Sequence, residues 1–598
     1  MSGEIIKSRL AVLRGRMREE NVSYYMVVTA DFHQSEYVAP YFKTREFLSG
    51  FTGSNGTLVV GTDSAGLWTD GRYFIQAQNE LEGTGIKLFR MGEKDVPEIP
   101  DYLYAVMKEN EVLSYDGRCV SHAITEELEK KLKGRKISIR TDLDLAGEIW
   151  TDRPALPMNP MFVLDEKYAG ESAESKLSRL FAELKKDGAD TYVTSRLDDL
   201  MWLYNVRGND VDYNPVALCN AVIGVNEQHF FVQPGELTDE VTAYFAGLGV
   251  ALHPYGEFYS FLADTDFPGK VLYDRDTAST AIVRALEGKN AAGTASPVTA
   301  MKARKNQTEI LNLRRAYIED SAAVAKMIFW VKNNVGKIPM TEWTVMEHLE
   351  GLRKQIGDFV ELSFGTIAAY GANAAMMHYS ADEESAAVIR PEGMLLVDSG
   401  GQYLGGTTDV TRTFAVGSVT DEMRKHYTLT AIATLRLQNA VFLEGCTGRN
   451  LDILARGVLW EHAMDYKCGT GHGIGYLLNV HEGPQNIRWK PAENEAALAP
   501  GMIVSDEPGV YLEGRYGIRI ENILLVEEYT ENSDGRFLHF LPLTFVPLDR
   551  DLIDEALLDR KDREMINTYH QYVYDALYPY LNEEEREFVA SQTKPFTV

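Results

Sequence analysis

The sequence is poor in cysteine and has no excess of basic residues. Its 598 residues include four cysteines, and no two of them have the C-x-x-C spacing of a metal or redox motif. Four cysteines are too few to form a disulfide framework in a chain of this length. We therefore expect the protein to reside in a reducing compartment. The 60 Lys and Arg residues against 88 Asp and Glu give a formal net charge of −28. Because a field of this sign repels nucleic-acid backbones and anionic lipid surfaces, we expect no nucleic acid and no membrane among the partners.

Long apolar runs are also missing. No segment has the roughly 18 consecutive apolar residues of a membrane-spanning helix. Basic residues interrupt every apolar run within residues 1–21, so this segment lacks the apolar core of a secretory signal and instead has the pattern of an amphipathic helix. We expect a cytoplasmic protein.

Several common catalytic motifs are absent. The sequence contains no HExxH, no GxxxxGK[ST] and no GxSxG. The segment Asp398–Gly401 has the letters DSGG of a serine-protease nucleophile segment, but no matching histidine and aspartate context accompanies Ser399. We therefore favour a chemical role for Asp398 over one for Ser399.

Two segments have the composition of linkers. The first, residues 151–160, contains three prolines, which exclude both a helix and a central strand. The second, residues 291–309, ends in Asn306 with Glu309 three residues later, which predicts a capped start of a helix with apolar positions from residue 310 to 331. The domains expected are residues 1–155, 156–303 and 304–598.

The first two of these domains share a pattern. Residues 7–28 and 175–194 each combine an amphipathic helix, a short polar turn and a β-rich run. Residues 47–74 and 198–232 then each continue with a strand, a turn and a second strand. We expect two related α/β domains, with a coincidence of pattern as the alternative.

A second internal repeat lies in the third domain. Residues 391–414 and 499–526 share a Gly-Met pair, an apolar strand, a carboxylate, a glycine-rich turn, a second strand and a second carboxylate. Each segment predicts a β-hairpin with acids on both arms. Two such hairpins facing one another across a pseudo-two-fold axis would bring their carboxylates to one metal site.

The acids of these hairpins are the main candidates for chemistry. They are Asp398, Asp409, Glu507 and Glu521. Acids inside apolar strands are costly to bury unless they meet a cation, so a shared metal explains them together. The strand period of two places Thr411 on the face of Asp409 and Arg519 on the face of Glu521, where each could support a ligand. The alternatives for single acids are a turn, a bulge, or salt bridges with Arg515 and Arg519.

Three histidines could complete such a site. His472 lies between glycines within residues 469–475, where the missing Cβ atoms allow a close approach to a metal. His378 and His481 are further candidates, with an ordinary structural role as the alternative. Four carboxylates and one imidazole favour Mn²⁺, with Fe²⁺, Co²⁺ or Zn²⁺ as alternatives, and this ligand number fits two ions about 3.5–4 Å apart.

These motifs together resemble a known family. The matching segments are VDSGGQYLGGTTDVTRT (397–413), GTGHGIGYLLNVHEGP (469–484), DEPGVYLEGRYGIRIEN (506–522), WTDGRYF (68–74) and LYNVRG (203–208). They are similar to those of the aminopeptidase P family, the Xaa-Pro aminopeptidases, in its long three-domain form among the metal-dependent pita-bread peptidases. The resemblance covers essentially the whole chain. It implies an α/β (α+β) fold of two creatinase-like domains followed by a pita-bread catalytic domain.

The resemblance also implies a reaction and a role for each candidate. The family cleaves the peptide bond between an N-terminal residue and a penultimate proline, by attack of a metal-bridging hydroxide. The five positions that match its ligands to two Mn²⁺ ions are Asp398, Asp409, His472, Glu507 and Glu521, with Asp409 and Glu521 as the bridging pair. Glu507 matches the general base, and His378 and His481 match histidines that hydrogen-bond the substrate and assist proton transfer. Arg519 matches an arginine that supports the ligands, and Arg72 is expected to reach the active site of the other subunit in a homodimer.

The sequence departs from the family at one site position. Four residues before His472 the family commonly has a histidine, and here Cys468 occupies that position. No ligand is affected, so the change bears on substrate preference and rate. The alternatives to an aminopeptidase are a prolidase acting on Xaa-Pro dipeptides, a non-catalytic peptide-binding relative and a metal-free creatinase-like hydrolase. The length of the chain argues against the first, and the presence of all five ligand positions argues against the other two.

Overall fold

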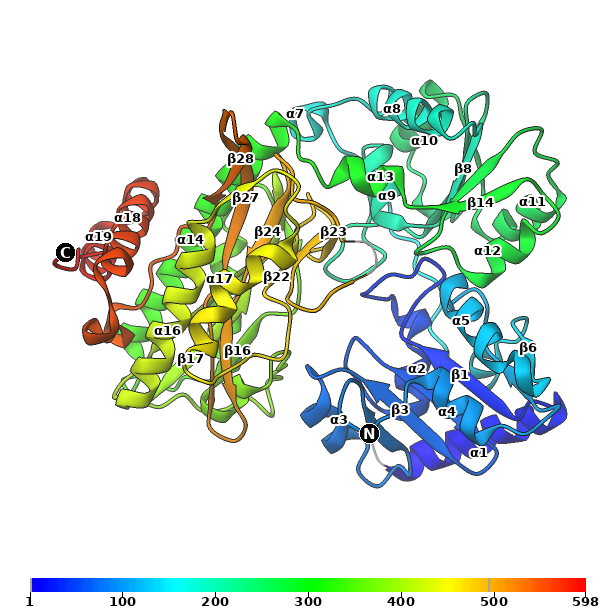
Figure 1. Cartoon of the computed structure of the whole chain (residues 1–598), viewed down its shortest axis with the longest axis horizontal. Coiled ribbons are helices and arrows are strands. Elements are labelled where there is room, and N and C mark those ends of the chain that lie inside the picture. Colours follow the sequence, from blue (N-terminus) through cyan, green and yellow to red (C-terminus); the bar gives the residue numbers. More distant parts are fainter. Residues whose placement is uncertain (1–2, 493–494) are drawn as a thin grey trace. The chain divides into compact units, whose positions relative to one another are not determined.

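The chain forms two compact units in the computed structural model, which describes residues 3–492 and 495–598 (Figure 1). The first unit comprises Met1–Asp165 and Glu171–Val298, and the second comprises Glu166–Gly170 and Thr299–Val598. The fold class is the one predicted, two related α/β domains followed by a pita-bread domain. The predicted boundaries after residues 155 and 303 stay predictions.

The first unit contains two six-stranded sheets with the same topology. The strand orders are β4-β3-β2-β1-β5-β6 and β12-β11-β10-β8-β13-β14. In each sheet the central strand pairs antiparallel with the next strand of its own meander and parallel with a later strand. The repeated pattern of the sequence therefore corresponds to a repeated topology, which confirms the prediction of two related domains.

The elements of the first sheet and its helices follow in chain order. They are α1 (Gly3–Glu19), β1 (Tyr24–Val28), α2 (Thr44–Ser49), β2 (Thr57–Gly61), β3 (Ala65–Thr69), α3 (Phe74–Glu80), β4 (Lys87–Arg90), α4 (Ile99–Val106), β5 (Val112–Ser114), α5 (His122–Leu132), β6 (Ser138–Arg140) and α6 (Leu145–Ile149). The predicted amphipathic helix is α1, which buries Ile6, Leu10, Leu13 and Met17 on one face at helical spacing.

The second sheet and its helices repeat this arrangement. They are α8 (Ala173–Lys186), β8 (Thr191–Thr194), α9 (Leu197–Leu203), β10 (Cys219–Gly224), β11 (Gln228–Val232), α10 (Asp239–Gly247), β12 (Val250–Pro254), α11 (Phe258–Asp264), β13 (Val271–Asp274), α12 (Thr280–Ala285) and β14 (Ala291–Thr294), with a short pair of β7 (Phe162–Val163) and β9 (Val206–Arg207). Ser172 caps α8 by accepting a hydrogen bond from the Ser175 N–H group.

The two predicted linkers have different outcomes. Residues 151–160 contain no helix or strand, as their prolines predict. The prediction for residues 291–309 is wrong in its first half, because residues 291–294 form β14 at the edge of the second sheet and Pro297–Lys302 form helix α13. Small residues are tolerated in an edge strand, and Pro297 occupies the first turn of a helix, where its missing N–H costs no hydrogen bond.

The second unit is built around antiparallel sheets. Its strands are β15 (Phe359–Leu362), β16 (Ile367–Tyr370), β17 (Met394–Ser399), β18 (Gly401–Tyr403), β19 (Gly406–Thr407), β20 (Val410–Ala415), β21 (Val441–Leu443), β22 (Gly471–Gly473), β23 (Glu482–Ile487), β24 (Ile503–Asp506), β25 (Gly509–Leu512), β26 (Tyr516–Arg519), β27 (Asn522–Asn532) and β28 (Gly535–Pro542). One sheet has the order β16-β17-β20, and another has the order β21-β28-β27-β24-β22-β23. These two sheets carry the candidate acids.

Helices of the second unit pack either along these sheets or on the helices that do so (Figure 1). They are α7 (Glu166–Ala169), α14 (Gln307–Asn334), α15 (Glu342–Arg353), α16 (Asp421–Gln438), α17 (Gly448–Trp460), α18 (Arg560–Leu577) and α19 (Glu583–Gln592). The predicted start of α14 is confirmed, since Asn306 and Glu309 form a reciprocal capping box. Helix α16 contacts β24 to β28, and α14 contacts α15, α18 and α19.

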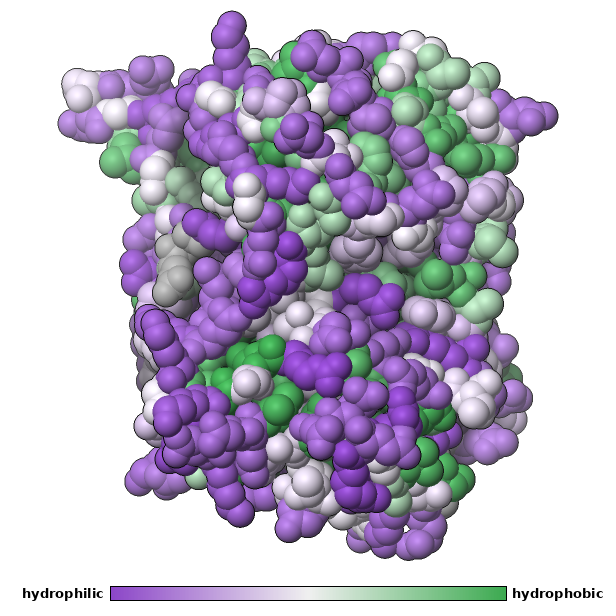
Figure 2. All heavy atoms as spheres, turned by 90° about the vertical axis from the view of Figure 1, so that its right-hand side faces the viewer, coloured by the Kyte–Doolittle hydropathy of each residue, from purple (hydrophilic) through white to green (hydrophobic). Residues whose placement is uncertain are grey.

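The exposed surface is mainly polar on the face drawn in Figure 2, with hydrophobic residues in small scattered groups. Within residues 3–492 and 495–598, no helix has the length and apolar character needed to cross a bilayer.

Candidate metal centre

The two predicted hairpins exist as two antiparallel strand pairs. In the first, β17 pairs with β20, and Asp398 lies opposite Thr411, while β18 and β19 are inserted between the two arms. In the second, β24 pairs with β27, and the small hairpin of β25 and β26 is inserted. Asp409 immediately precedes β20, Glu507 immediately follows β24, and Glu521 immediately precedes β27. The acids are thus placed at strand ends that converge from two sheets.

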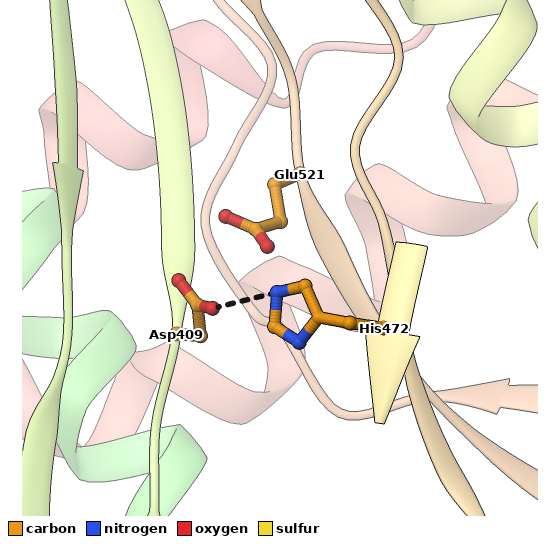
Figure 3. A group of neighbouring side chains, drawn as sticks. All are labelled: Asp409, His472 and Glu521. Carbon is orange, nitrogen blue, oxygen red and sulfur yellow. Dashed lines mark ion pairs between the residues drawn. The ribbon is translucent and has the colours of Figure 1, made fainter. Parts of the chain in front are cut away.

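Three of the candidate ligands form one cluster (Figure 3). Ligand atoms of Asp409, His472 and Glu521 all lie within 4.8 Å of one another. His472 Nε2 is 3.5 Å from Asp409 Oδ2 and 3.3 Å from Glu507 Oε1. The structure therefore brings a carboxylate of each strand pair to the same imidazole nitrogen.

The local backbone fixes the orientation of the His472 ring. Its Nδ1 lies 2.9 Å from the carbonyl oxygen of Gly473, which can only accept, so Nδ1 donates this hydrogen bond and Nε2 faces the acids. The His472 N–H group donates to Ser505 Oγ at 2.9 Å, and this hydroxyl donates to Glu507 Oε1 at 3.0 Å. A Cβ atom at Gly471 would lie 1.8 Å from the carbonyl oxygen of Ser505, so glycine is required for this close approach.

Arg519 joins the two strand pairs beside the cluster. Its guanidinium forms an ion pair with Asp398 and donates to Thr411 Oγ1 at 3.1 Å and to Tyr511 OH at 2.9 Å. Thr411 Oγ1 in turn donates to Glu521 Oε2 at 2.8 Å. Both residues expected beside the ligands, Thr411 and Arg519, thus contact candidate ligands directly.

The acids of the centre repel one another. Burial and then the charges of Asp398 and Glu507 raise the pKa of Asp409 well above its ordinary value, and burial and then Asp409 raise the pKa of Glu521 in the same way. Burial also raises the pKa of Glu507 to about 7. Oδ1 of Asp398 is buried with no hydrogen-bond partner within the described residues. Buried carboxylates with this surplus of negative charge fit divalent cations, which would neutralise it.

His378 lies in the loop that follows β16, and a buried glutamate organises this loop. Glu342, at the start of α15, accepts hydrogen bonds from the Tyr370 N–H group at 2.6 Å, from Tyr379 OH at 2.8 Å and from the Ala387 N–H group at 2.8 Å. Sequence reasoning missed Glu342, because the groups that donate hydrogen bonds to it lie 28 to 45 residues away in the sequence and no local pattern connects them.

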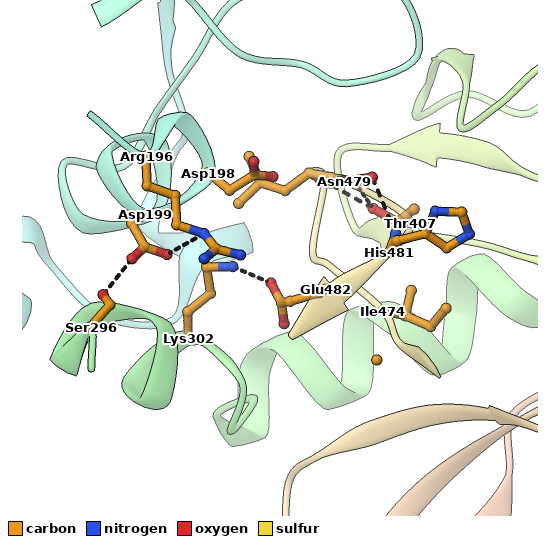
Figure 4. A network of polar contacts seen from close by, with 12 residues as sticks. Arg196, Asp198, Asp199, Ser296, Lys302, Thr407, Ile474, Asn479, His481 and Glu482 are labelled. Atoms are coloured by element: carbon orange, nitrogen blue, oxygen red, sulfur yellow. Dashed lines mark hydrogen bonds and ion pairs between the residues drawn. The ribbon is translucent and has the colours of Figure 1, made fainter. Parts of the chain in front are cut away.

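His481 lies close to His472 and is followed by a buried charged group. The ring centroids of the two histidines are 4.3 Å apart, with their planes at 88°. The next residue, Glu482, forms an ion pair with Lys302 at 2.7 Å (Figure 4). It forms a second ion pair with Lys305. Lys305 Nζ also donates to the carbonyl oxygen of Ile474 at 2.7 Å. These lysines anchor both ends of the segment between His472 and His481, and sequence reasoning missed them as well.

Cys468 lies in a loop that Arg456 holds in place. The Arg456 guanidinium donates to the carbonyl oxygens of Cys468 at 3.0 Å and Tyr466 at 2.7 Å, and it forms an ion pair with Asp452 at 2.8 Å. Asp452 also accepts from Thr470 Oγ1 at 2.6 Å. Two side chains of α17, those of Arg456 and Asp452, therefore hold the backbone between Cys468 and His472 in place.

Arg72 belongs to the first unit and lies in the turn that follows β3. It forms a bidentate pair with Asp70, with Nε to Oδ1 at 2.9 Å and Nη2 to Oδ2 at 2.8 Å. Its side chain remains 30% exposed, so the guanidinium is oriented by Asp70 and still accessible to another molecule.

Family models match four segments of the chain. Residues 312–528 match metallopeptidase family M24, and residues 536–596 match the C-terminal region of that family. Residues 9–148 and 152–309 each match the creatinase/prolidase N-terminal domain. The match of both N-terminal segments to this domain type agrees with the repeated sheet topology.

Full-length relatives carry the same architecture. The chain is 39% identical to a probable Xaa-Pro aminopeptidase P of Neurospora crassa, over 98% of this chain and 89% of that one, and 36% identical to Xaa-Pro aminopeptidase 1 of Dictyostelium discoideum, over 99% and 96%. The crystal structure of X-prolyl aminopeptidase from Caenorhabditis elegans, described as a cytosolic enzyme with a di-nuclear active site, superposes with a TM-score of 0.95 at 33% identity and covers all of both chains.

The fold and the acid-rich centre define a metal-dependent hydrolase. The chain belongs to the Xaa-Pro aminopeptidase family within metallopeptidase family M24.

Proposed function

We propose that the protein is an aminopeptidase that releases the N-terminal residue from peptides with proline in the second position. The observation that carries this proposal is the convergence of Asp409, His472 and Glu521, from two sheets, beside Glu507 and the pair of Asp398 with Arg519. The similarity to Xaa-Pro aminopeptidases extends over nearly the whole chain, which favours this reaction over that of a prolidase.

The donor set supports a dinuclear centre. We propose that Asp398, Asp409, His472, Glu507 and Glu521 hold two Mn²⁺ ions, with Co²⁺, Fe²⁺ or Zn²⁺ as alternative metals, and that Asp409 and Glu521 bridge them. Oxygen-rich sites favour such ions, and the di-nuclear site of the nematode relative supports the number two. When bound, the ions would polarise the scissile carbonyl and lower the pKa of water.

The remaining side chains have separate tasks in the proposed reaction. Glu507 accepts a proton, and its Oε1 is oriented by Ser505 Oγ. His481, beside His472, and His378, in the loop held by Glu342, donate hydrogen bonds to the substrate as charge develops on its carbonyl oxygen. Arg519 and Thr411 hold the ligands Asp398 and Glu521 in position.

The test compares three peptides on the full-length protein. After chelation and again after restoring Mn²⁺, release of the N-terminal residue is measured from an Xaa-Pro-Xaa tripeptide, an Xaa-Pro dipeptide and an Xaa-Ala-Xaa control. We expect Mn²⁺-dependent cleavage of the first peptide alone. Cleavage of the dipeptide alone would make the protein a prolidase, and no cleavage by metal-loaded protein would favour a peptide-binding role.

We propose the cytoplasm as the location and a homodimer as the assembly, in which Arg72 reaches the active site of the other subunit. The nematode relative is described as cytosolic. An exposed apolar surface of the second unit supports the dimer: Trp460, at the end of α17, and Trp489 are 43% and 45% exposed, with ring centroids 6.1 Å apart, and Ile453 of α17 is also exposed. Adjacent exposed tryptophans are typical of protein interfaces.

Trp489→Ser should convert a dimer to monomers. Trp489 is preferred to Trp460 for this test, because Trp460 Nε1 also donates to Asp465 near the Cys468 loop. Light scattering after size-exclusion chromatography measures the mass. Tyr529→Ser, at an aromatic residue of β27 that is 58% exposed, is the control and should leave the mass unchanged. A Trp489→Ser variant with the mass of the wild-type assembly would place the interface elsewhere.

A further inference from the structure

Arg412 connects β20 to the backbone of Glu521. It lies between Thr411 and Thr413, so its side chain is on the opposite face of the strand from theirs, and it is 1% exposed. Its Nη1 donates to the carbonyl oxygen of Thr411 at 2.9 Å and to that of Glu521 at 2.6 Å. The Glu521 N–H group donates back to the Thr411 carbonyl oxygen at 3.1 Å. Glu521 is therefore held to β20 on both sides of its Cα atom.

The other edge of the Arg412 guanidinium faces the C-terminal region. Nη2 donates to Asn522 Oδ1 at 2.7 Å, to the carbonyl oxygen of Val546 at 2.8 Å and to Tyr569 OH, on α18, at 2.7 Å. Tyr569 OH also lies 2.7 Å from the Val546 carbonyl oxygen and 3.2 Å from Asn522 Oδ1. Asn522 is itself oriented, because its Nδ2 donates to Gln438 Oε1 at 2.7 Å.

This network joins the two sheets that supply the candidate ligands, and the metal centre depends on a fixed distance between them. Arg412 belongs to the sheet of β16, β17 and β20, whereas Glu521 and Asn522 lead into β27 of the other sheet. The acids contributed by these two sheets repel one another, so the two halves need an attachment behind the site. A guanidinium with five fixed donors supplies it, and each lost hydrogen bond would leave a buried polar group unsatisfied.

We infer that Arg412 and Tyr569 are positioning residues for the metal centre, and that helix α18 takes part in metal affinity through them. They act by fixing the backbone of Glu521 against β20, and neither side chain touches the ligand oxygens. The inference rests on the proposed function, since it takes Glu521 to be a ligand. A tyrosine on α18 thereby sets the separation between ligands supplied by the two sheets.

The test is Tyr569→Phe, which removes one hydroxyl from the network and keeps the ring. Tyr572→Phe is the matched control, because Tyr572 lies on the same helix and its OH donates to a backbone carbonyl oxygen, that of Pro542, at 3.2 Å. Mn²⁺ affinity of the metal-free full-length proteins is measured by calorimetry, together with the electron paramagnetic resonance spectrum of the Mn²⁺-loaded forms and the thermal midpoint of the metal-free forms.

We expect Tyr569→Phe to weaken Mn²⁺ affinity by about 10-fold, the lower end of what loss of an outer hydrogen bond costs a metal site. Its Mn²⁺ spectrum should also change, whereas Tyr572→Phe should match the wild type in both measurements. Equal affinities and spectra for the two variants, with equal losses of thermal midpoint, would overturn the inference and leave Tyr569 a purely structural residue. A wild-type protein that binds no Mn²⁺ would instead overturn the proposed metal centre, and the inference with it.

Discussion

Asp409→Asn should abolish metal-dependent peptide cleavage and at the same time stabilise the metal-free protein. Asp409 is 4% exposed, and its Oδ2 lies 3.5 Å from His472 Nε2 at the meeting point of the two sheets. Loss of a group that only supports a ligand already costs a metal site about 10- to 100-fold in affinity or activity. Removal of a charged ligand should therefore lower kcat/KM on the Xaa-Pro-Xaa tripeptide by more than about 100-fold.

Asp409→Asn should lower activity but raise the stability of the metal-free protein, and the electrostatics of the centre explain this gain in stability. Burial and neighbouring acids raise the pKa of Asp409 and of Glu521 well above their ordinary values, so the metal-free fold bears the cost of crowded carboxylates. Each unit of such a shift corresponds to about 1.4 kcal/mol. A neutral amide at position 409 removes one of these charges, so the free energy of unfolding of the metal-free protein should rise.

The measurements are activity, Mn²⁺ binding and chemical denaturation, each with and without chelator. Asp534→Asn, at an exposed turn residue after β27, is the control and should behave as wild type in all three. The stabilisation of wild type by Mn²⁺ should be lost or strongly reduced in Asp409→Asn. Full activity in a metal-free Asp409→Asn protein would refute the metal-dependent mechanism.

The candidate site could be located from the sequence because acids in apolar strands have few physical explanations. Asp398 lies within a strand whose other residues are all buried. The period of two predicted Thr411 on the face of Asp409 and Arg519 on the face of Glu521, and the structure shows Thr411 in contact with Glu521 and Arg519 in contact with Asp398. The glycines around His472 were informative for a similar reason, since Gly471 leaves no room for a Cβ atom. These signals are local in the chain, so a single sequence contains them.

The supporting residues could not be found in this way. The sequence contains Arg412 between two threonines of the motif but does not reveal its hydrogen-bond partners. These partners, Glu521, Val546 and Tyr569, lie 109 to 157 residues away. Glu342 organises the His378 loop through hydrogen bonds from groups 28 to 45 residues later in the sequence. Hydrogen bonds between residues so distant in sequence depend on the register of the sheets, which the pattern of one chain does not reveal.

The error at residues 291–309 has a different cause. Ala291, Ala292 and Gly293 have low β propensity, so the pattern predicted a linker. Pairing with β13 along the edge of the second sheet decides their conformation instead. Tertiary contacts thus override a weak local preference, and the same effect inserts β18 and β19 into what the pattern presented as a simple hairpin.

Glu482→Gln should destabilise the second unit strongly and displace His481. Glu482 carries the carboxylate that faces both Lys302 and Lys305, and the three side chains are at most 2% exposed. A glutamine has one carbonyl oxygen to offer two ammonium groups, so buried positive charge would be left uncompensated. Breaking a buried ion pair by removing one partner costs about 3–5 kcal/mol, because the remaining charge has lost its water as well as its partner.

Glu422→Gln is the control for this variant. Glu422 pairs with Arg515, and their side chains are 46% and 52% exposed, so water replaces the lost partner and the free energy of unfolding should stay close to that of wild type. Denaturation of the metal-free proteins measures the difference between the two variants. A double variant, Lys305→Met with Glu482→Gln, should be more stable than Glu482→Gln alone, since it removes one of the two uncompensated charges.

Because Glu482 follows His481 directly, and Lys305 also holds the carbonyl oxygen of Ile474, the same variant should alter catalysis. A displaced His481 would bind the substrate carbonyl less well as its charge develops, which lowers kcat more than it raises KM. Metal content should be retained, because Glu482 contacts none of the candidate ligands through a hydrogen bond within the described residues. Two results would contradict this prediction. A loss of stability no larger than that of Glu422→Gln would show that the lysines do not depend on this carboxylate, and a wild-type kcat would show that they do not position His481.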